Sequence, residues 1–160
     1  YSIKENRQDG VPLINVFGGK ITTYRKLAES VIKEVGLFLP KIQEPWTDKA
    51  HLPGGDFAID GLSELISDLL EAFPFLNVKW ATRLVKAYGK EAFKMLGSVR
   101  SEEDLGLNFG ATLTQKEVEW LIKEEFATSA EDILWRRSKF GLRLSELQVK
   151  TLQDWIASQN

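Results

Sequence analysis

A double glycine followed by a lysine and two threonines is the segment of this sequence best suited to chemistry. Gly18 and Gly19 close an apolar, strand-like stretch. Lys20 comes next, and Thr22 and Thr23 then open a stretch with helical periodicity. Glycines let the backbone approach a ligand closely, and the first N–H groups of a helix have no partner within the helix. Because the helix dipole adds about half a positive charge at that end, the segment predicts a site that receives an anion.

Lys20 adds a full, mobile positive charge to this predicted site, and the two threonine hydroxyls can cap the helix. A phosphate group would fit such a site, and so would the negatively charged N1–C2=O edge of a reduced flavin. The same pattern is also typical of a glycine turn with a threonine cap and a solvated lysine, so the spacing alone leaves both interpretations open. The segment matches neither GxxxxGK[ST] nor GxGxxG, the two common nucleotide-binding loops.

The elements that position this segment are a predicted β-hairpin and a predicted helix. Residues 1–17 read as the hairpin, because residues 6–10 carry turn chemistry between two β-prone stretches. Residues 11–17 are almost continuously apolar, which is typical of a strand covered on both faces. The apolar spacing predicts a helix over 22–38, ending near Pro40. Since two strands alone are only marginally stable, we expect the hairpin to be the edge of a larger sheet.

The second half of the chain has helical periodicity. Residues 41–60 are rich in proline and glycine and lack sustained periodicity, which predicts a linker. Beyond the linker, apolar spacing predicts helices that stop at Pro74, Gly89 and Gly97. Capping-box spacing predicts four further helix starts, at Ser101 with Asp104, Thr114 with Glu117, Ser129 with Asp132, and Ser145 with Gln148.

Composition excludes several functional classes. The chain has 160 residues, 43% of them hydrophobic and 28% charged, which is ordinary for a globular protein. A formal net charge of -2 argues against nucleic acid as a partner, because that binding rests on clustered positive charge. With no cysteine and a single histidine, His51, we predict no metal site. The chain starts at Tyr1 without methionine, so we expect a piece of a longer protein, and we find no catalytic residues within it.

Three motifs, in order, resemble one enzyme family. Residues 15–29 (NVFGGKITTYRKLAE) closely resemble a signature near the end of the flavin domain of FAD-dependent, respiratory glycerol-3-phosphate dehydrogenases. Trp46-Thr47 with residues 52–55 (LPGG) resembles the exit loop of that family. Residues 130–142 (AEDILWRRSKFGL) resemble its C-terminal motif, which often has threonine where Ser138 stands. The resemblance spans nearly the whole chain and indicates a C-terminal fragment that contains the helical cap domain.

The resemblance implies an enzyme that oxidises sn-glycerol 3-phosphate to dihydroxyacetone phosphate with FAD and passes the electrons to a quinone. Carried over by position, Gly18 and Gly19 would approach the isoalloxazine ring, and Thr22 and Thr23 would donate to its O2/N1 edge. Lys20 would neutralise negative charge on the substrate phosphate or the reduced flavin. No GxGxxG motif is present, so the resemblance implies that the fragment alone retains no FAD and is inactive.

The expected fold class is mainly α: a compact, bundle-like helical domain preceded by a short β-hairpin and a helix left over from an α/β FAD-binding domain. We expect residues 1–40 to be the remnant of the FAD-binding domain, 41–60 the linker and 61–160 the helical cap domain. The expected partners are the N-terminal FAD domain of the same protein, glycerol 3-phosphate and a quinone. The expected location is the cytoplasm, or the inner face of the cytoplasmic membrane as a peripheral protein.

Other interpretations stay open at this level. One is a glycerol-3-phosphate oxidase that uses O2, and another is a non-catalytic helical module for oligomerisation, such as a homodimer, or for membrane docking. Residues 135–143 (WRRSKFGLR) form the densest basic patch and mix aromatic with basic side chains, as interfacial helices do. Charge clusters on helices more often form ion pairs, so we expect Arg137 to pair with Asp132 or Glu131.

Overall fold

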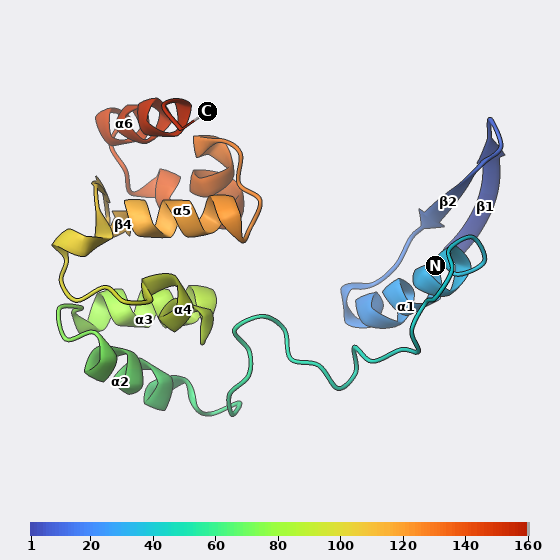
Figure 1. Ribbon diagram of the computed structural model, residues 1–160, viewed down its shortest axis with the longest axis horizontal. Helices are drawn as coiled ribbons and strands as arrows, with labels where there is room; N and C mark the ends of the chain where they lie inside the picture. Colours follow the sequence, from blue (N-terminus) through green and yellow to red (C-terminus); the bar gives the residue numbers. More distant parts are fainter. Residues whose placement is uncertain (160) are drawn as a thin grey trace. The chain divides into compact units, whose positions relative to one another are not determined.

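The computed structural model describes residues 1–159, and Asn160 lies outside the described residues. The chain divides into two compact units, one from Tyr1 to His51 and the other from Leu52 onward (Figure 1). The division falls inside the segment predicted as a linker. Helices make up most of the regular structure, which confirms the mainly α fold class.

The first unit is a hairpin followed by one helix. Strands β1 (Ser2–Gln8) and β2 (Val11–Phe17) pair antiparallel, from Ser2 opposite Phe17 to Gln8 opposite Val11. A 3-10 turn, η1 (Ile21–Thr23), leads into α1 (Tyr24–Val35). The predicted hairpin is therefore confirmed, whereas the α-helix is shorter than the predicted 22–38 because its first turn is wound as a 3-10 helix.

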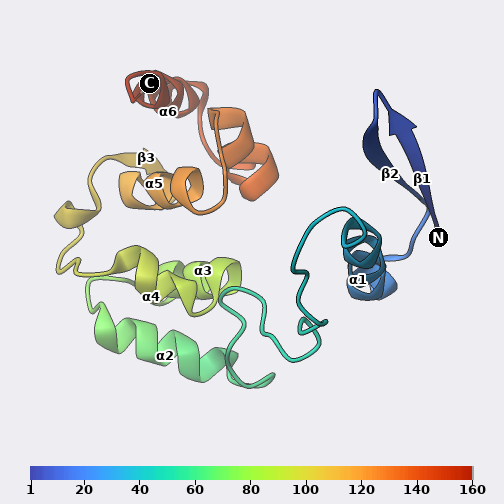
Figure 2. The same ribbon diagram turned by 45° about the vertical axis from the view of Figure 1, so that its right-hand side comes forward.

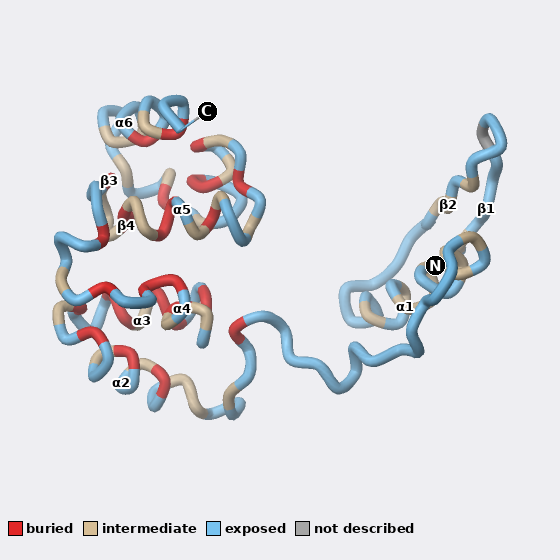
Figure 3. Tube along the Cα trace, viewed as in Figure 1, coloured by how far each residue is buried: buried red, intermediate tan, exposed pale blue. Residues whose placement is uncertain are grey.

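The first unit has no core of its own. No described residue between positions 1 and 51 is buried (Figure 3). Leu13, Val16 and Phe17 on β2 are 47%, 42% and 56% exposed. The prediction of a strand covered on both faces is thus not met within this unit, because a hairpin and one amphipathic helix supply too little surface to enclose these side chains.

The second unit is a helical domain with a small hairpin in its middle (Figures 1 and 2). Side chains from all along the unit form its core, and among the fully buried ones are Leu69, Leu84, Leu113, Leu121 and Leu152. Its elements, in order, are α2 (Leu62–Ala72), α3 (Val78–Tyr88), α4 (Glu91–Leu96), η2 (Glu103–Leu105), β3 (Asn108–Gly110), β4 (Leu113–Thr114), α5 (Gln115–Lys123), η3 (Asp132–Arg137), η4 (Phe140–Leu142) and α6 (Glu146–Ala157).

The local signals in this unit predicted most helix boundaries. The helices α2, α3 and α4 end just before Pro74, Gly89 and Gly97 respectively. The capping box at the start of α6 is present: the Gln148 N–H donates to Ser145 Oγ, and the Ser145 N–H donates to Gln148 Oε1 at 2.9 Å.

Two predictions about the secondary structure of this unit were wrong. The hairpin of β3 and β4 interrupts a stretch predicted as wholly helical. Its turn residues, Ala111 and Thr112, have φ of 50° and 71° without the glycine or asparagine that normally marks such a turn. The predicted capping box at Thr114 is also absent, because the Thr114 side chain caps no N–H group and Glu117 is buried instead.

The exit of the linker into the second unit is fixed by close backbone contact. The Lys90 N–H donates to the Gly54 carbonyl at 3.0 Å. Gly54 and Gly89 both have positive φ, and a Cβ on either would lie 2.1 Å from a backbone oxygen beside it. Only glycines permit this close approach, so the backbone at residues 52–55 is held in one position against the start of α4.

Candidate functional site

The predicted anion site is an open turn between β2 and α1. Gly18 and Gly19 have φ of 75° and 135°, values that other residues rarely adopt. A Cβ placed on Gly18 would have no heavy atom within 4 Å, so a planar ligand can approach the backbone there. Lys20 has extended backbone angles and directs the chain into η1. Sequence adjacency alone brings the five predicted residues together at this turn.

Hydrogen bonds within the turn use some of its donors and leave others unused. The Thr23 N–H and the Thr23 hydroxyl both donate to the Lys20 carbonyl, at 2.9 and 3.1 Å. The hydroxyl therefore closes the turn, and the expected cap on a helix N–H is not made. Among the described residues, the backbone N–H groups of Lys20, Ile21 and Thr22 have no hydrogen-bond partner. These three donors remain available to an anionic ligand.

Within residues 1–159, Lys20 is the positively charged residue of this turn that no carboxylate pairs with. The Glu29 carboxylate binds Arg25 at 2.7 Å and Lys26 at 2.9 Å, and it also accepts a bond from Thr47 at 3.0 Å. The Lys26 bond first, and then the Thr47 bond, hold the pKa of Glu29 below its ordinary value. Lys20 is exposed and forms no ion pair within residues 1–159. The turn therefore carries net positive charge on the side of Lys20.

These residues fit one edge of a flavin. Three free N–H donors and an ammonium group suit the electron-rich N1–C2=O edge, and the open backbone at Gly18 suits the face of a planar ring. The adenosine and diphosphate parts of FAD need a further glycine-rich loop, and the sequence contains no GxGxxG. The donors described here would therefore suit one edge of the isoalloxazine ring and not the rest of FAD.

A buried ionic network in the helical domain went unpredicted. Arg83 donates from Nη1 and Nη2 to the two oxygens of Glu117, each at 2.7 Å, and the Tyr88 hydroxyl donates to Glu117 Oε1 at 2.7 Å. Arg83 also binds the Thr112 hydroxyl and carbonyl, and it lies 4.9 Å from the centroid of the Phe140 ring. Burial, and then the Glu117 charge, raise the pKa of Tyr88 well above its ordinary value.

This network serves the fold. Both oxygens of Glu117 are occupied, and its side chain is only 2% exposed, so no substrate can reach it. Its one signal in the sequence is position, since Glu117 stands next to Val118 and four residues before Leu121 on the buried face of α5. A carboxylate on such a face predicts a buried partner of opposite charge.

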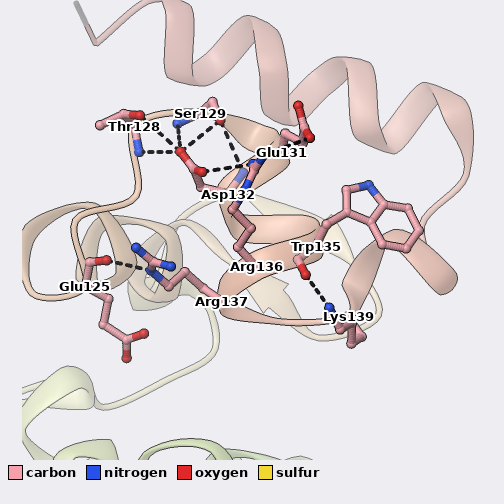
Figure 4. A network of polar contacts seen from close by, with 9 residues as sticks. All are labelled: Glu125, Thr128, Ser129, Glu131, Asp132, Trp135, Arg136, Arg137 and Lys139. Carbon is pink, nitrogen blue, oxygen red and sulfur yellow. Dashed lines mark hydrogen bonds and ion pairs between the residues drawn. The ribbon is translucent and has the colours of Figure 1, made fainter. Parts of the chain in front are cut away.

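The motif at residues 130–142 holds a second polar network, centred on Asp132 (Figure 4). The Asp132 carboxylate accepts bonds from the N–H groups and hydroxyls of Thr128 and Ser129. The Thr128 N–H first, and then the Ser129 hydroxyl, lower the pKa of Asp132 far below its ordinary value. Arg136 pairs with Asp132 at 3.0 Å and with Glu131 at 3.1 Å. The ion-pair role expected for this patch is present, but it belongs to Arg136.

The predicted partners of Arg137 were wrong. Arg137 Nε donates to the Glu125 backbone carbonyl at 2.6 Å. Arg136, four residues after Asp132, holds that carboxylate at 3.0 Å. Arg137 instead lies toward the C-terminal end of α5, where it finds the Glu125 carbonyl (Figure 4). The segment η3 is a π-helix, in which the Ser138 N–H donates to the Ile133 carbonyl five residues back, and the sequence did not predict it.

Residues 1–159 contain neither a cluster of metal ligands nor a helix that could span a membrane. No group of three histidine, aspartate or glutamate side chains lies close enough together to hold a metal ion. No helix in the same residues has the length and apolar character needed to cross a membrane.

Comparisons with known proteins agree with the motifs. A family described as the C-terminal domain of alpha-glycerophosphate oxidase matches residues 45–157. A glycerol-3-phosphate dehydrogenase of Pseudomonas aeruginosa is 42% identical over 93% of this chain and 29% of its own length. The aerobic glycerol-3-phosphate dehydrogenase of Escherichia coli is 35% identical over 98% of this chain and 31% of its own length. A D-erythritol 1-phosphate dehydrogenase of Brucella abortus is 34% identical over 94% of this chain and 30% of its own length.

The chain therefore spans about 30% of the length of these curated relatives. The resemblance to the C-terminal part of glycerol-3-phosphate dehydrogenases is confirmed. Because the family match covers residues 45–157, well over half of the sequence, the chain belongs to the family of the C-terminal domain of alpha-glycerophosphate oxidase.

Proposed function

We propose that this chain is the C-terminal part of an FAD-dependent dehydrogenase that oxidises sn-glycerol 3-phosphate to dihydroxyacetone phosphate. The observation that carries the proposal is the open, positively charged turn at residues 18–23. The relatives support it, because two of them are named glycerol-3-phosphate dehydrogenases and are 35% and 42% identical to this chain. In this proposal residues 1–40 complete a flavin domain, 41–60 form the linker, and 61–160 form the cap domain.

The turn would act by positioning and by charge. FAD, when bound, supplies the acceptor for the hydride that leaves C2 of the substrate. The free N–H groups of residues 20–22 would hold the negative charge that develops on the N1–C2=O edge. Gly18 and Gly19 would admit the ring, and the Thr22 hydroxyl would donate to the same edge. Lys20 would bind the substrate phosphate, for which a mobile ammonium group at the turn is suited.

The Thr23 hydroxyl needs a different role from the one that the resemblance implies. Its proton is donated to the Lys20 carbonyl in this structure. We therefore propose that Thr23 sets the direction of the backbone at Lys20, and that it donates to the flavin only if that internal bond is exchanged.

Quinone is the electron acceptor that we propose, with molecular oxygen as the alternative. The relative in Escherichia coli is named an aerobic dehydrogenase, whereas the matching family is described from an oxidase. Because quinones are dissolved in the lipid bilayer, a quinone acceptor would place the whole protein peripherally on the inner face of the cytoplasmic membrane. Turnover with a quinone analogue under nitrogen, against turnover with O2 alone, separates the two.

D-Erythritol 1-phosphate is a second candidate substrate. The relative in Brucella abortus with that named activity is 34% identical to this chain, close to the 35% of the Escherichia coli protein. Both substrates present a phosphate and a secondary hydroxyl, and they differ by one hydroxymethylene group. In this proposal the turn at residues 18–23 binds the phosphate that both substrates share, so the turn does not discriminate between them. The ratio of kcat/KM for the two substrates, measured on the complete polypeptide, decides which is preferred.

The remainder of the protein is the partner that the first unit requires. Exposed apolar side chains on β2 and at Ile21, which is 87% exposed, would be covered by the rest of the flavin domain. The direct test is to purify the complete polypeptide and measure glycerol-3-phosphate-dependent dye reduction with and without residues 1–160. Loss of activity on removal supports the proposal. A complete polypeptide without such activity, or a 160-residue chain that binds anionic liposomes on its own, favours the non-catalytic module.

A further inference from the structure

Phe126 combines a left-handed backbone with an exposed aromatic side chain, which that turn does not require. It follows α5, has a φ of 57°, and its side chain is 79% exposed. The left-handed region is unfavourable for residues with a Cβ. Because the Phe126 ring is exposed, burial of apolar surface does not offset this cost. Strain of this kind, where the surroundings do not explain it, is concentrated at functional surfaces.

The turn that holds Phe126 is complete without its side chain. The Ala127 N–H donates to the Leu121 carbonyl at 3.0 Å, six residues back along the chain, so the backbone folds over the end of α5 at this point. Ala127 and Leu121 are buried, at 2% and 0% exposed. Glycine is the usual residue at a left-handed position that follows a helix. Phenylalanine there is a cost to the isolated domain.

Arg137 is held beside Phe126. Its Nε donates to the Glu125 carbonyl at 2.6 Å, on the residue just before Phe126 (Figure 4). Arg137 is exposed, and within residues 1–159 its two terminal amino groups have no hydrogen-bond partner. Arginine is among the residues that contribute most to binding energy, and phenylalanine is enriched at protein interfaces. An arginine bonded to the backbone beside an exposed phenylalanine therefore suits an interface.

We propose that Phe126 and Arg137 anchor the helical domain onto the flavin domain of the same polypeptide, in the part of the protein outside residues 1–160. This inference rests on the proposed function, which supplies that domain. The relatives are about three times as long as this chain, so such a protein contains the required surface. The linker holds the two domains at a high effective concentration, which favours this contact over one with a second copy. The receiving surface is an apolar pocket for the ring, rimmed by carboxylate or carbonyl oxygens for the guanidinium group.

Photo-crosslinking in the complete polypeptide identifies the occupant. With Phe126→p-benzoylphenylalanine, irradiation followed by peptide mass spectrometry should give an intramolecular link to a residue outside 1–160. A link to a second copy, a link to another protein, or no link overturns the proposal. The readout requires no bound flavin and no activity. If the complete polypeptide binds no flavin but still gives the intramolecular link, the proposed function is refuted and the docking is supported. If it is active but gives no link, the docking is refuted and the proposed function stands.

Phe126→Gly gives an independent test through the sign of its effect. In the 160-residue chain it should raise Tm, because it relieves the left-handed strain and removes an exposed ring. In the complete polypeptide it should lower Tm and speed proteolytic cleavage of residues 44–58 several-fold. Leu142→Ala is the matched control, since Leu142 is 75% exposed without left-handed backbone, and it should change neither protein. A shift of the same sign in both proteins overturns the proposal.

Discussion

Arg83 and Glu117, thirty-four residues apart, meet in a two-pronged ion pair whose N–O distances are both 2.7 Å. The pair joins α3 to α5. Through Thr112 it also holds a turn with two left-handed residues. Glu117 is 2% exposed and Arg83 is 19% exposed. A carboxylate so deeply buried is tolerated only because three donors reach it.

Removing the carboxylate should therefore be costly. Glu117→Ala leaves the Arg83 charge largely buried and the Tyr88 hydroxyl unpaired, so we expect the free energy of unfolding to fall by about 3 kcal/mol. Urea denaturation followed by circular dichroism measures it. The control is Lys150→Ala, which breaks an ion pair whose side chains are 68% and 65% exposed and should change stability by less than about 0.5 kcal/mol. Equal losses of unfolding free energy in the two variants would show that the buried ion pair stabilises the fold no more than the exposed one.

Tyr88 should make the domain sensitive to alkali. Its pKa in the folded protein is raised above the ordinary 10.0, by burial first and then by Glu117. The folded state therefore holds this proton more tightly than the unfolded state. The resulting stabilisation is complete below pH 10 and is lost as the pH rises further.

The variant Tyr88→Phe tests this dependence. It should be about 1 kcal/mol less stable than wild type at pH 8, since one buried hydrogen bond is lost. The difference should shrink or reverse by pH 11.5, because only in the wild type does unfolding release the Tyr88 proton, which favours the unfolded state at that pH. Tyr24→Phe, which alters a side chain that is 58% exposed, should follow wild type at both pH values. A stability difference that stays constant with pH would refute the assignment.

Asp132 should produce the opposite dependence in acid. Bonds from the Thr128 and Ser129 N–H groups and hydroxyls lower its pKa below the ordinary 3.8. Its stabilisation is thus complete above pH 3.8 and is lost as the pH falls below that value. Asp132→Asn should be less stable than wild type at pH 7, and the difference should narrow steadily as the pH falls from 3.8 to 2.5 in urea titrations. Asp154→Asn, at a position whose side chain is 65% exposed, is the control. A stability difference that stays constant between pH 3.8 and pH 2.5 would contradict this account.

The features that the sequence predicted correctly are local ones. Apolar spacing and the stops at Gly89 and Gly97 predicted α3 and α4, and the Ser145-x-x-Gln148 pattern predicted the start of α6. The turn at residues 18–23 was predictable for the same reason, because its groups are neighbours in the chain. Such features depend on a few adjacent residues and on little else.

The features that the sequence did not predict depend on distant partners. The turn at Ala111 and Thr112 has no glycine at its two central positions and is held by Arg83, which lies 29 residues before Thr112, so only Gly110 beside it signals a turn in the sequence. Glu117 fits the spacing of a capping box with Thr114, but the attraction of a buried arginine outweighs that local option. The other walls of a flavin pocket would likewise come from residues that no local pattern in these 160 positions describes.

Lys20 should matter to substrate binding in the complete polypeptide. Lys20→Ala should raise KM for glycerol 3-phosphate about 10- to 100-fold, the value of one charge-assisted hydrogen bond, and Lys20→Arg should restore part of it. Lys33→Ala, in the last turn of α1, is the control for general loss of positive charge. Steady-state kinetics at fixed ionic strength give the comparison. Unchanged kinetics for Lys20→Ala would remove this residue from the site.

Anaerobic titration of the complete, FAD-reconstituted polypeptide with sn-glycerol 3-phosphate tests the central claim most directly. The account predicts that the flavin absorbance near 450 nm disappears as substrate is added, with one equivalent of dihydroxyacetone phosphate formed per flavin. Mutating Lys20 should shift the titration to higher substrate concentrations. A polypeptide that binds no flavin, or a flavin that neither glycerol 3-phosphate nor D-erythritol 1-phosphate reduces, would contradict it.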